Sequence, residues 1–242
     1  TRGFDYYFGV DVPNWPPYCF IENDRTVGIP SEFLPSRLVG DNLASFSGPA
    51  MPYWNFEQLL PTWAKQADHY IQQRAASDQP FFLYLPMTSP HTPLSVNKPW
   101  IGKSGLNNLY ADLVLETDDI FGQILTSLNK YDMADNTLVI FTSDNGPVWY
   151  DKDTDRFGHR STGPLLGAKG SAWEGGHRMP FIARWPDRIE AGSQTDQTIS
   201  FVDVFATFAD LAGQKKIAEG TAEDSSSFLP VLLDPNGKHE PR

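Results

Sequence analysis

Hydrophobic positions recur at helical spacing in three stretches of the chain. Residues 57–76 and 107–131 show apolar side chains every three or four positions, which predicts helices with one buried face. Residues 202–212 are a shorter helix candidate. The buried faces are expected to carry Leu60, Trp63, Ala64, Ala67 and Ile71 in the first helix, and Leu109, Leu113, Ile120, Ile124 and Leu128 in the second.

Continuous apolar runs at 81–85, 137–142 and 180–185 instead predict buried strands. Helices that alternate with such strands are typical of an α/β layered sheet. We expect the first two strands to be parallel neighbours, because the helix at 107–131 supplies the crossover between them. Residues 1–56, rich in Pro, Gly and aromatic side chains, predict loops and short strands.

Composition narrows the class of protein. Hydrophobic residues make up 40% of the 242 positions, which suits one sizeable α/β domain. Thirty acidic against nineteen basic side chains give a net charge of −11, so nucleic acid is not an expected partner. No apolar run approaches the roughly 20 residues of a membrane span. Cys19 is the only cysteine, so no internal disulfide can form.

Candidate chemistry lies where two predicted strands end, and ligands of open α/β sheets bind at the carboxyl ends of strands. His91 follows the first strand in a proline-rich loop and could donate a proton, although a histidine in such a loop is more often a packing residue than a catalyst. Asp144 and Asn145 follow the second strand and offer hard oxygen ligands for Ca²⁺ or Mg²⁺. Asp-Asn-Gly is also common turn chemistry, so that alternative stays open.

Cationic side chains in the glycine-rich stretch after residue 146 are candidates for anion binding. Lys169 stands between Gly167 and Gly170, where an anion can approach backbone and ammonium together. His159 and Arg160 add two further groups. For Lys169 the alternative is a solvated loop lysine, which the spacing alone would favour.

Four separated segments of the chain form distinct motifs: residues 3–9 (GFDYYFG), 80–93 (PFFLYLPMTSPHTP), 136–146 (NTLVIFTSDNG) and 167–180 (GAKGSAWEGGHRMP). In sequence and in order they resemble the motifs of the type I sulfatases of the alkaline phosphatase superfamily. The resemblance implies an alkaline-phosphatase-like α/β/α layered sheet, mostly parallel and here incomplete at both ends. It also implies a sulfuric ester hydrolase that acts on a sulfated carbohydrate or an aryl sulfate.

The resemblance further implies residue roles. Asp144 and Asn145 would complete a calcium site whose other acidic ligands come from the family's N-terminal strand. His91 and Lys169 would contact the sulfate and the leaving-group oxygen, with His159 and Arg160 as substrate-binding candidates. Calcium, lysine and histidine together would neutralise charge that develops on the sulfuryl group.

One departure from the pattern concerns the nucleophile, which in the family is a formylglycine made from the Cys or Ser of a C/S-x-P-x-R motif. That motif precedes the GFDxFxG segment, whereas only Thr1 and Arg2 precede it here. Cys19 lacks the proline and arginine that should follow, and Phe33 occupies the nucleophile position of the Pro35-Ser36-Arg37 match. No nucleophile is therefore assigned, and we expect the chain to be inactive without the N-terminal part of the same protein.

The chain is thus interpreted as a partial sulfatase catalytic domain over 1–242. Residues 1–56 form a loop-rich substrate-side segment, 57–212 the α/β core with the site loops, and 213–242 a polar connection toward a C-terminal subdomain. By family resemblance a bacterial source would place it in the periplasm or outside the cell.

Two other functions stay open. A related phosphatase or phosphodiesterase would use two zinc ions, and the chain shows one Asp-Asn pair without a paired metal-histidine motif. A non-catalytic remnant would bind a sulfated glycan. Aromatic side chains near the motif loops could stack on a sugar or aryl ring or simply pack; they are Trp15, Tyr18, Trp149, Tyr150 and Trp173.

Overall fold

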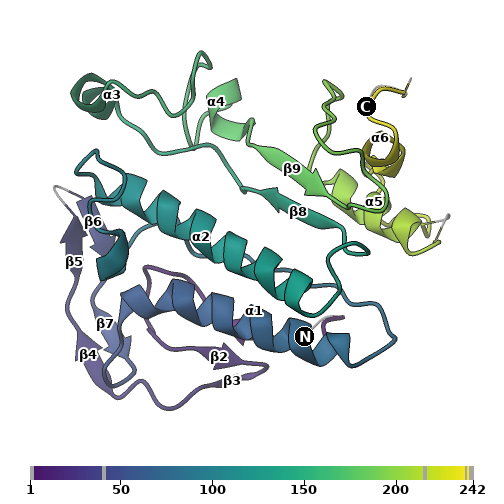
Figure 1. Cartoon of the computed structure of the whole chain (residues 1–242). Helices are drawn as coiled ribbons and strands as arrows, with labels where there is room; N and C mark the ends of the chain where they lie inside the picture. Colours follow the sequence, from purple (N-terminus) through teal and green to yellow (C-terminus); the bar gives the residue numbers. More distant parts are fainter. Residues whose placement is uncertain (1–2, 40–41, 215–216, 238, 240–242) are drawn as a thin grey trace. The chain divides into compact units, whose positions relative to one another are not determined.

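The computed structural model describes residues 3–39, 42–214, 217–237 and 239. Its chain divides into two compact units, Thr1–Met133 and Ala134–Arg242, whose elements are labelled in Figure 1. Each unit is built from helices and short strands.

Short antiparallel strands make up the beginning of the first unit, as predicted for residues 1–56. Strands β1 (Phe8–Gly9), β2 (Ile21–Glu22) and β3 (Arg25–Thr26) form one sheet. Two further pairs are β4 (Glu32–Leu34) with β7 (Gly48–Ala50), and β5 (Arg37–Val39) with β6 (Asn42–Ser45).

The first predicted helix is confirmed. A short 3-10 turn, η1 (Phe56–Gln58), leads into α1 (Leu59–Ala75). Pro61 lies in the first turn of α1, where a missing N–H breaks no helical hydrogen bond. The five apolar residues expected on its inner face are all buried.

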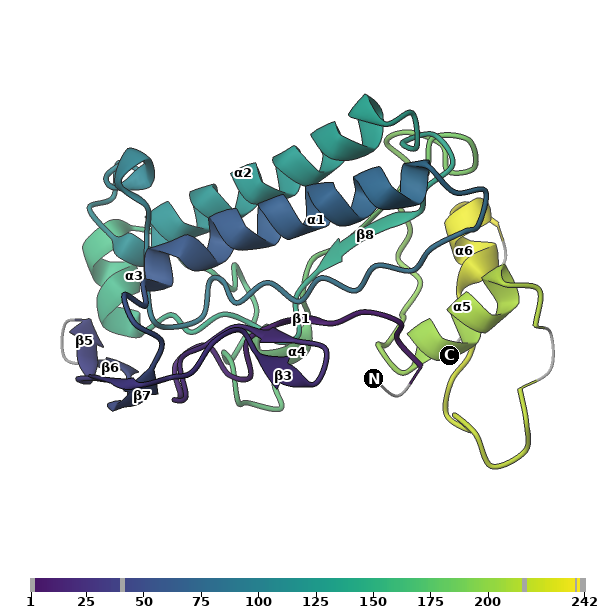
Figure 2. The same cartoon turned by 90° about the horizontal axis from the view of Figure 1, so that it is seen from below.

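The second predicted helix is α2 (Leu109–Lys130), which the Asn108 side chain caps by accepting from Ala111 N–H at 3.1 Å. Its expected apolar stripe is buried except Leu109, which at the first position is 37% exposed. Figures 1 and 2 show α1 and α2 side by side along their lengths. A hydrogen bond of 2.7 Å from Ser127 Oγ to Asp68 joins the two helices. A 3-10 turn, η2 (Lys98–Trp100), precedes α2.

The second unit centres on one antiparallel pair, β8 (Val139–Thr142) and β9 (Phe181–Arg184), which fall in two of the predicted strand runs. Helices α5 (Asp203–Leu211) and α6 (Leu229–Leu233) follow, and α6 lies within the segment interpreted as a polar connection. Phe228, Val231 and Leu232 form its buried cluster, with the Phe228 and Phe181 rings 5.6 Å apart.

The strand predicted at 81–85 is wrong, and so is its parallel pairing with 137–142. These residues belong to no described strand, and Phe82 and Tyr84 are 54% and 67% exposed. An apolar run specifies that a segment can be buried, whereas a strand also needs a partner in register. The described ladders are all antiparallel, with a single parallel bridge between Tyr18 and Ala50.

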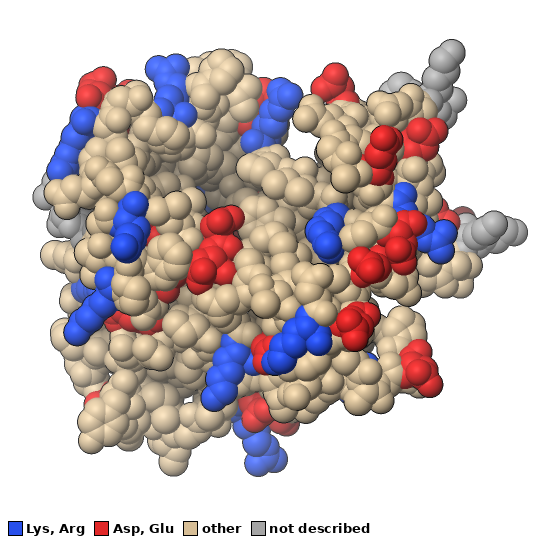
Figure 3. Space-filling model, viewed as in Figure 1, with Lys and Arg blue, Asp and Glu red and all other residues tan. Residues whose placement is uncertain are grey.

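Among the described residues, no helix combines the length and apolar character needed to cross a bilayer. On the face drawn in Figure 3, basic and acidic side chains are interspersed.

Candidate functional site

The predicted site residues of the second unit all lie in the connection between β8 and β9. Thr142 pairs with Phe181 in the ladder, and Thr142 Oγ1 donates a 2.9 Å hydrogen bond to the carbonyl of Pro180. Segment 143–180 therefore leaves the ladder and returns to it at the same end. Asp144, Asn145, His159, Arg160 and Lys169 lie on this segment.

Backbone hydrogen bonds hold the turn after β8 against the rest of this segment. Gly146 N–H donates to the Gly176 carbonyl at 2.9 Å, within the short helix α4 (Glu174–His177). Lys169 N–H donates to the Pro147 carbonyl at 3.0 Å. The Asp144-Asn145 turn, the Lys169 loop and α4 thus form one cluster.

Glycine is required where these backbones meet. A Cβ added to Gly146 would collide with the Gly175 carbonyl oxygen, and one added to Gly175 would collide with that of Gly167. Gly146 and Gly175 are buried, and Gly167 has a φ of +87°, in the left-handed region that other residues rarely adopt. The glycines of the 167–180 motif therefore allow close packing around the predicted metal ligands.

The side chains of Asp144, Asn145 and Lys169 are available to a ligand. None has a hydrogen-bond or ion-pair partner among the residues that the structure describes, and Asp144 and Lys169 are exposed. Ser143 Oγ donates to the Asn145 carbonyl at 3.2 Å, which fixes the backbone of the turn.

The donors of the turn suit part of a calcium site. One carboxylate and one amide oxygen are hard ligands, and Ca²⁺ takes about 6–8 oxygens. Within the described ranges, no group of three or more His, Cys, Asp or Glu side chains is arranged to hold a metal ion.

His159 and Arg160 follow α3 (Asp151–Phe157), which ends at Gly158 with a φ of 63°. Trp149 Nε1 donates to the His159 carbonyl at 2.8 Å, and the two rings meet edge to face at 5.6 Å. Both His159 and Arg160 are exposed. These contacts hold His159 against Trp149, which lies shortly after Asn145 in the sequence.

His91 lies in the first unit, in an exposed position with a fixed ring. Its Nδ1 is 2.8 Å from the Thr92 carbonyl oxygen, and its backbone N–H donates to Thr88 at 3.2 Å. A carbonyl only accepts, so Nδ1 carries the proton and Nε2 is the nitrogen left for a substrate.

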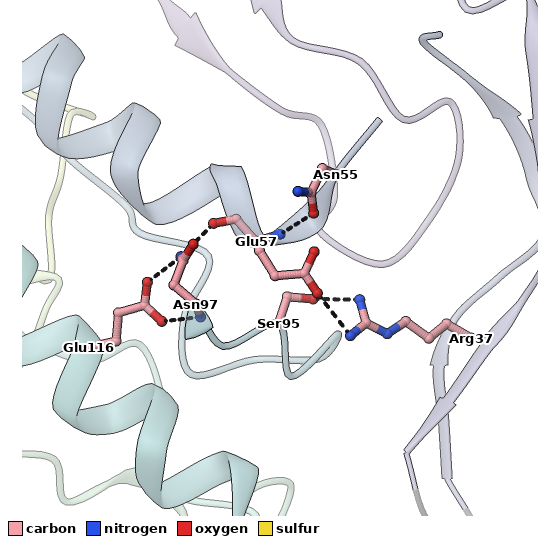
Figure 4. A network of polar contacts seen from close by, with 6 residues as sticks. All are labelled: Arg37, Asn55, Glu57, Ser95, Asn97 and Glu116. Carbon is pink, nitrogen blue, oxygen red and sulfur yellow. Dashed lines mark hydrogen bonds and ion pairs between the residues drawn. The ribbon is translucent and has the colours of Figure 1, made fainter. Parts of the chain in front are cut away.

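Polar contacts hold the chain that follows His91, as drawn in Figure 4. Arg37 donates to Ser95 Oγ and to Glu57 Oε1, both at 3.1 Å. The backbone N–H of Asn97 donates to Glu116 Oε2 at 2.9 Å. Strand β5, turn η1 and helix α2 therefore converge on residues 95–97.

Sequence reasoning missed the buried polar residues of α2, three of which lie in its first half. Asp112, Glu116 and Thr117 are 2%, 1% and 7% exposed. A signal was present, because Glu116 and Thr117 fall between Leu113 and Ile120 in the apolar stripe, where polar side chains need specific partners.

The structure brings Asp144, Asn145 and Lys169 together through the backbone of the second unit. His91 belongs to the first unit, and its convergence with them stays a prediction. A hollow of about 570 Å³ in the first unit, between α1 and α2, is lined by none of the predicted site residues.

Comparisons with known proteins agree over most of the chain. The sulfatase family model matches residues 2–214. An N-acetylgalactosamine-6-O-sulfatase of Bacteroides thetaiotaomicron is 31% identical over 96% of this chain and 52% of its own length. The human N-acetylgalactosamine-6-sulfatase is 35% identical over 96% of this chain and 42% of its own length.

A solved structure is also similar to this chain in its fold. It comes from work on glycosaminoglycan metabolism by Bacteroides thetaiotaomicron and superposes with a TM-score of 0.83 at 29% identity. The superposition covers 99% of this chain and 56% of the other. The chain therefore spans about half the length of the relatives it matches, and its α/β architecture is that of sulfatases with the alkaline-phosphatase-like fold.

Proposed function

Because the chain belongs to the sulfatase family, we propose that the protein hydrolyses sulfate esters of a carbohydrate. The observation that carries the proposal is the backbone-bonded cluster of Asp144, Asn145 and Lys169, whose side chains are free of partners among the described residues. Two relatives are named as N-acetylgalactosamine-6-sulfatases, so the 6-sulfate of that sugar is the first substrate to test.

Asp144 and Asn145 would hold a calcium ion, as part of its oxygen shell. When bound, the ion supplies positive charge next to the sulfuryl oxygens. The close glycine packing next to the turn and the Ser143 hydrogen bond fix the backbone that carries both residues, which favours a rigid pair of ligands.

Lys169 would bind a sulfate oxygen, because an ammonium is a strong donor to an anion and cannot be a metal ligand. His159 and Arg160 would add donors for the anion or the sugar. In its imidazolium form, with both ring nitrogens protonated, His91 would give the Nε2 proton to the leaving alcohol while Nδ1–H stays bonded to the Thr92 carbonyl. No residue of this chain is proposed as the nucleophile, and formylglycine is the group that the family would supply.

The test uses the complete gene product that contains this chain and three variants. Asp144→Ala should lose calcium and activity together. Lys169→Ala should lose activity but keep the metal. His91→Ala should lower kcat about a hundredfold or more with a sugar sulfate and much less with an activated aryl sulfate, because a poor leaving group needs the proton.

Asp151→Ala, at an exposed position of α3, is the control and should keep both metal and activity. Zinc in place of calcium, together with higher activity on phosphate esters, would support a phosphatase instead. Binding of sulfated glycan with no turnover by the complete gene product would support a non-catalytic role. Equal metal loss in all three variants would overturn the residue roles.

A further inference from the structure

Helix α2 binds the segment that contains His91 at several points along its length. Thr117, Glu116 and Asp112 each contact a different part of residues 89–104, in reverse order along the helix. These three side chains are buried although the residues are polar. The inner face of α2 is thus a polar support for the loop as well as an apolar packing surface.

Thr117 holds the stem before His91. Its hydroxyl lies 2.7 Å from the Leu113 carbonyl oxygen and 2.7 Å from Ser89 Oγ. A hydroxyl has one proton, so Thr117 donates to the carbonyl and accepts from Ser89. Ser89 is two positions before His91.

Glu116 holds the stem after His91. Its Oε2 accepts from Asn97 N–H at 2.9 Å, and its Oε1 accepts from the Asn97 side chain. The same side chain donates to the Glu57 carbonyl at 2.6 Å, which adds η1 to the support. Consecutive residues of one helix therefore fix the chain on both sides of His91.

Between these two points the loop has little freedom of its own. Pro90 and Pro93 restrict φ on either side of His91, and Pro93 is buried. Movement of the His91 backbone then depends chiefly on whether the stems shift relative to α2, and the ring itself is held by its contact with Thr92. Breaking a partly buried hydrogen bond at a stem leaves the buried Thr117 or Glu116 without its loop partner, so such shifts are unfavourable.

We propose that Thr117 and Glu116 are positioning residues for His91, which keep the ring bonded to Thr92 and Nε2 directed at the leaving group. The inference rests on the proposed role of His91 as proton donor. Neither residue touches the substrate in this proposal; both act through the loop.

The decisive variant is Thr117→Val, which removes the hydroxyl and nearly preserves the volume. In the complete gene product, kcat with a sugar sulfate should fall about tenfold, because small misplacements of a reacting group lower the rate strongly. KM, and kcat with an activated aryl sulfate, should change less than about twofold, because neither depends on proton donation. Thr117→Ser keeps the hydroxyl and should restore the wild-type rate.

Thr126→Val is the matched control. Thr126 lies on the same helix and donates to the carbonyl four residues before it, at 2.9 Å, as Thr117 does. It is exposed and bonds to no loop residue within the described part of the chain. Its rates on both substrates should equal those of the wild type.

A second measurement follows the ring directly. NMR of nitrogen-labelled histidine at alkaline pH reports which ring nitrogen carries the proton. The wild type should show His91 protonated at Nδ1, whereas Thr117→Val should show a mixture of both tautomers. The other histidines should not change.

The outcomes separate the two proposals. If His91→Ala shows the leaving-group dependence and Thr117→Val does not, the positioning inference is wrong and the proposed function stands. If His91→Ala shows none, His91 is not the proton donor and the positioning inference fails with it, whereas absence of sulfate-ester turnover by the wild type would overturn the proposed function itself. Should Thr117→Val not fold, Ser89→Ala removes the partner hydroxyl instead, and a wild-type rate and tautomer in that variant would overturn the inference.

Discussion

Asp112 shows how a buried carboxylate can stabilise a loop. It accepts hydrogen bonds from Gly102 N–H at 2.8 Å and from Ser104 N–H at 2.9 Å. Burial alone would raise the pKa of Asp112, but these backbone bonds and the Ser104 hydroxyl outweigh it and lower the pKa below 3.8. The charged form is therefore the one that the fold favours.

This residue should contribute to acid sensitivity. The unfolded chain takes up the proton at the ordinary pKa of 3.8 and the folded chain only at lower pH. The contribution of Asp112 is thus complete above about pH 5 and is lost as pH falls through the folded-state pKa. Asp112→Asn should lower the free energy of unfolding at pH 7 by about 1–3 kcal/mol, because one backbone N–H loses its acceptor.

Denaturant titrations from neutral to acid pH measure both effects. The decline of stability in acid should be shallower in Asp112→Asn than in the wild type. Asp118→Asn, at an exposed position of the same helix, serves as control and should follow the wild-type curve. Identical pH dependence of all three proteins would contradict the assignment.

Cys19 should be chemically inert in the folded chain. The side chain is 2% exposed, and burial, aided by the charge of Asp11, raises the pKa of the thiol. Alkylation should be at least about a hundredfold slower than in denaturant, because attack needs both the thiolate and local opening. Cys19 is the only cysteine, so one colorimetric thiol assay suffices; rapid reaction of the native chain would refute this.

At the scale of elements, the two long helices were predictable and their polar contacts were not. Apolar spacing located α1 and α2 because each buries a continuous stripe. The same spacing places Glu116 and Thr117 on the buried face of α2, but it does not identify the partners that these polar side chains need. Their partners, Asn97 and Ser89, come from a loop whose path no local pattern specifies.

The residues of the candidate site were also predictable from the sequence, whereas the contacts between their loops were not. Sequence order and chemistry singled out Asp144, Asn145 and Lys169, and the structure joins their loops through Gly146 and Pro147. The joining itself depends on long-range backbone contacts that periodicity does not report. The 81–85 run failed as a strand for a related reason, because pairing is a property of two segments.

The glycine contacts in segment 143–180 lead to a prediction. Gly175→Ala would place a methyl group against the Gly167 carbonyl, and such overpacking costs about 1–3 kcal/mol of folding free energy. Gly122→Ala is the matched control: this glycine of α2 has no atom within 4 Å of an added Cβ. Alanine at position 122 should raise the free energy of unfolding by about 0.5–1 kcal/mol.

Denaturant unfolding of both variants tests this prediction. Alanine should lower the free energy of unfolding at position 175 and raise it at position 122. A destabilisation of Gly122→Ala as large as that of Gly175→Ala would show that close packing is not the cause.

At the scale of the whole molecule, the charge balance predicts that the chain does not bind nucleic acid. A net charge of −11 repels phosphate backbones, and Figure 3 shows basic side chains separated by acidic ones on the face drawn. Non-specific DNA binders have Kd values of about 10⁻⁴–10⁻⁶ M. In gel retardation at physiological salt, the chain at about 10 μM should leave duplex DNA unshifted. A shift that weakens with added salt would contradict this.

The return of segment 143–180 to its starting point has a consequence for how such proteins diversify. Because Thr142 and Phe181 are paired, the segment between them is a cassette with adjacent ends. Exchanging it between related chains would transfer Asp144, Asn145, His159, Arg160 and Lys169 in one step while the β8–β9 ladder stays intact. Ligand chemistry in this unit can thus be inherited as a block, independently of the strands that display it.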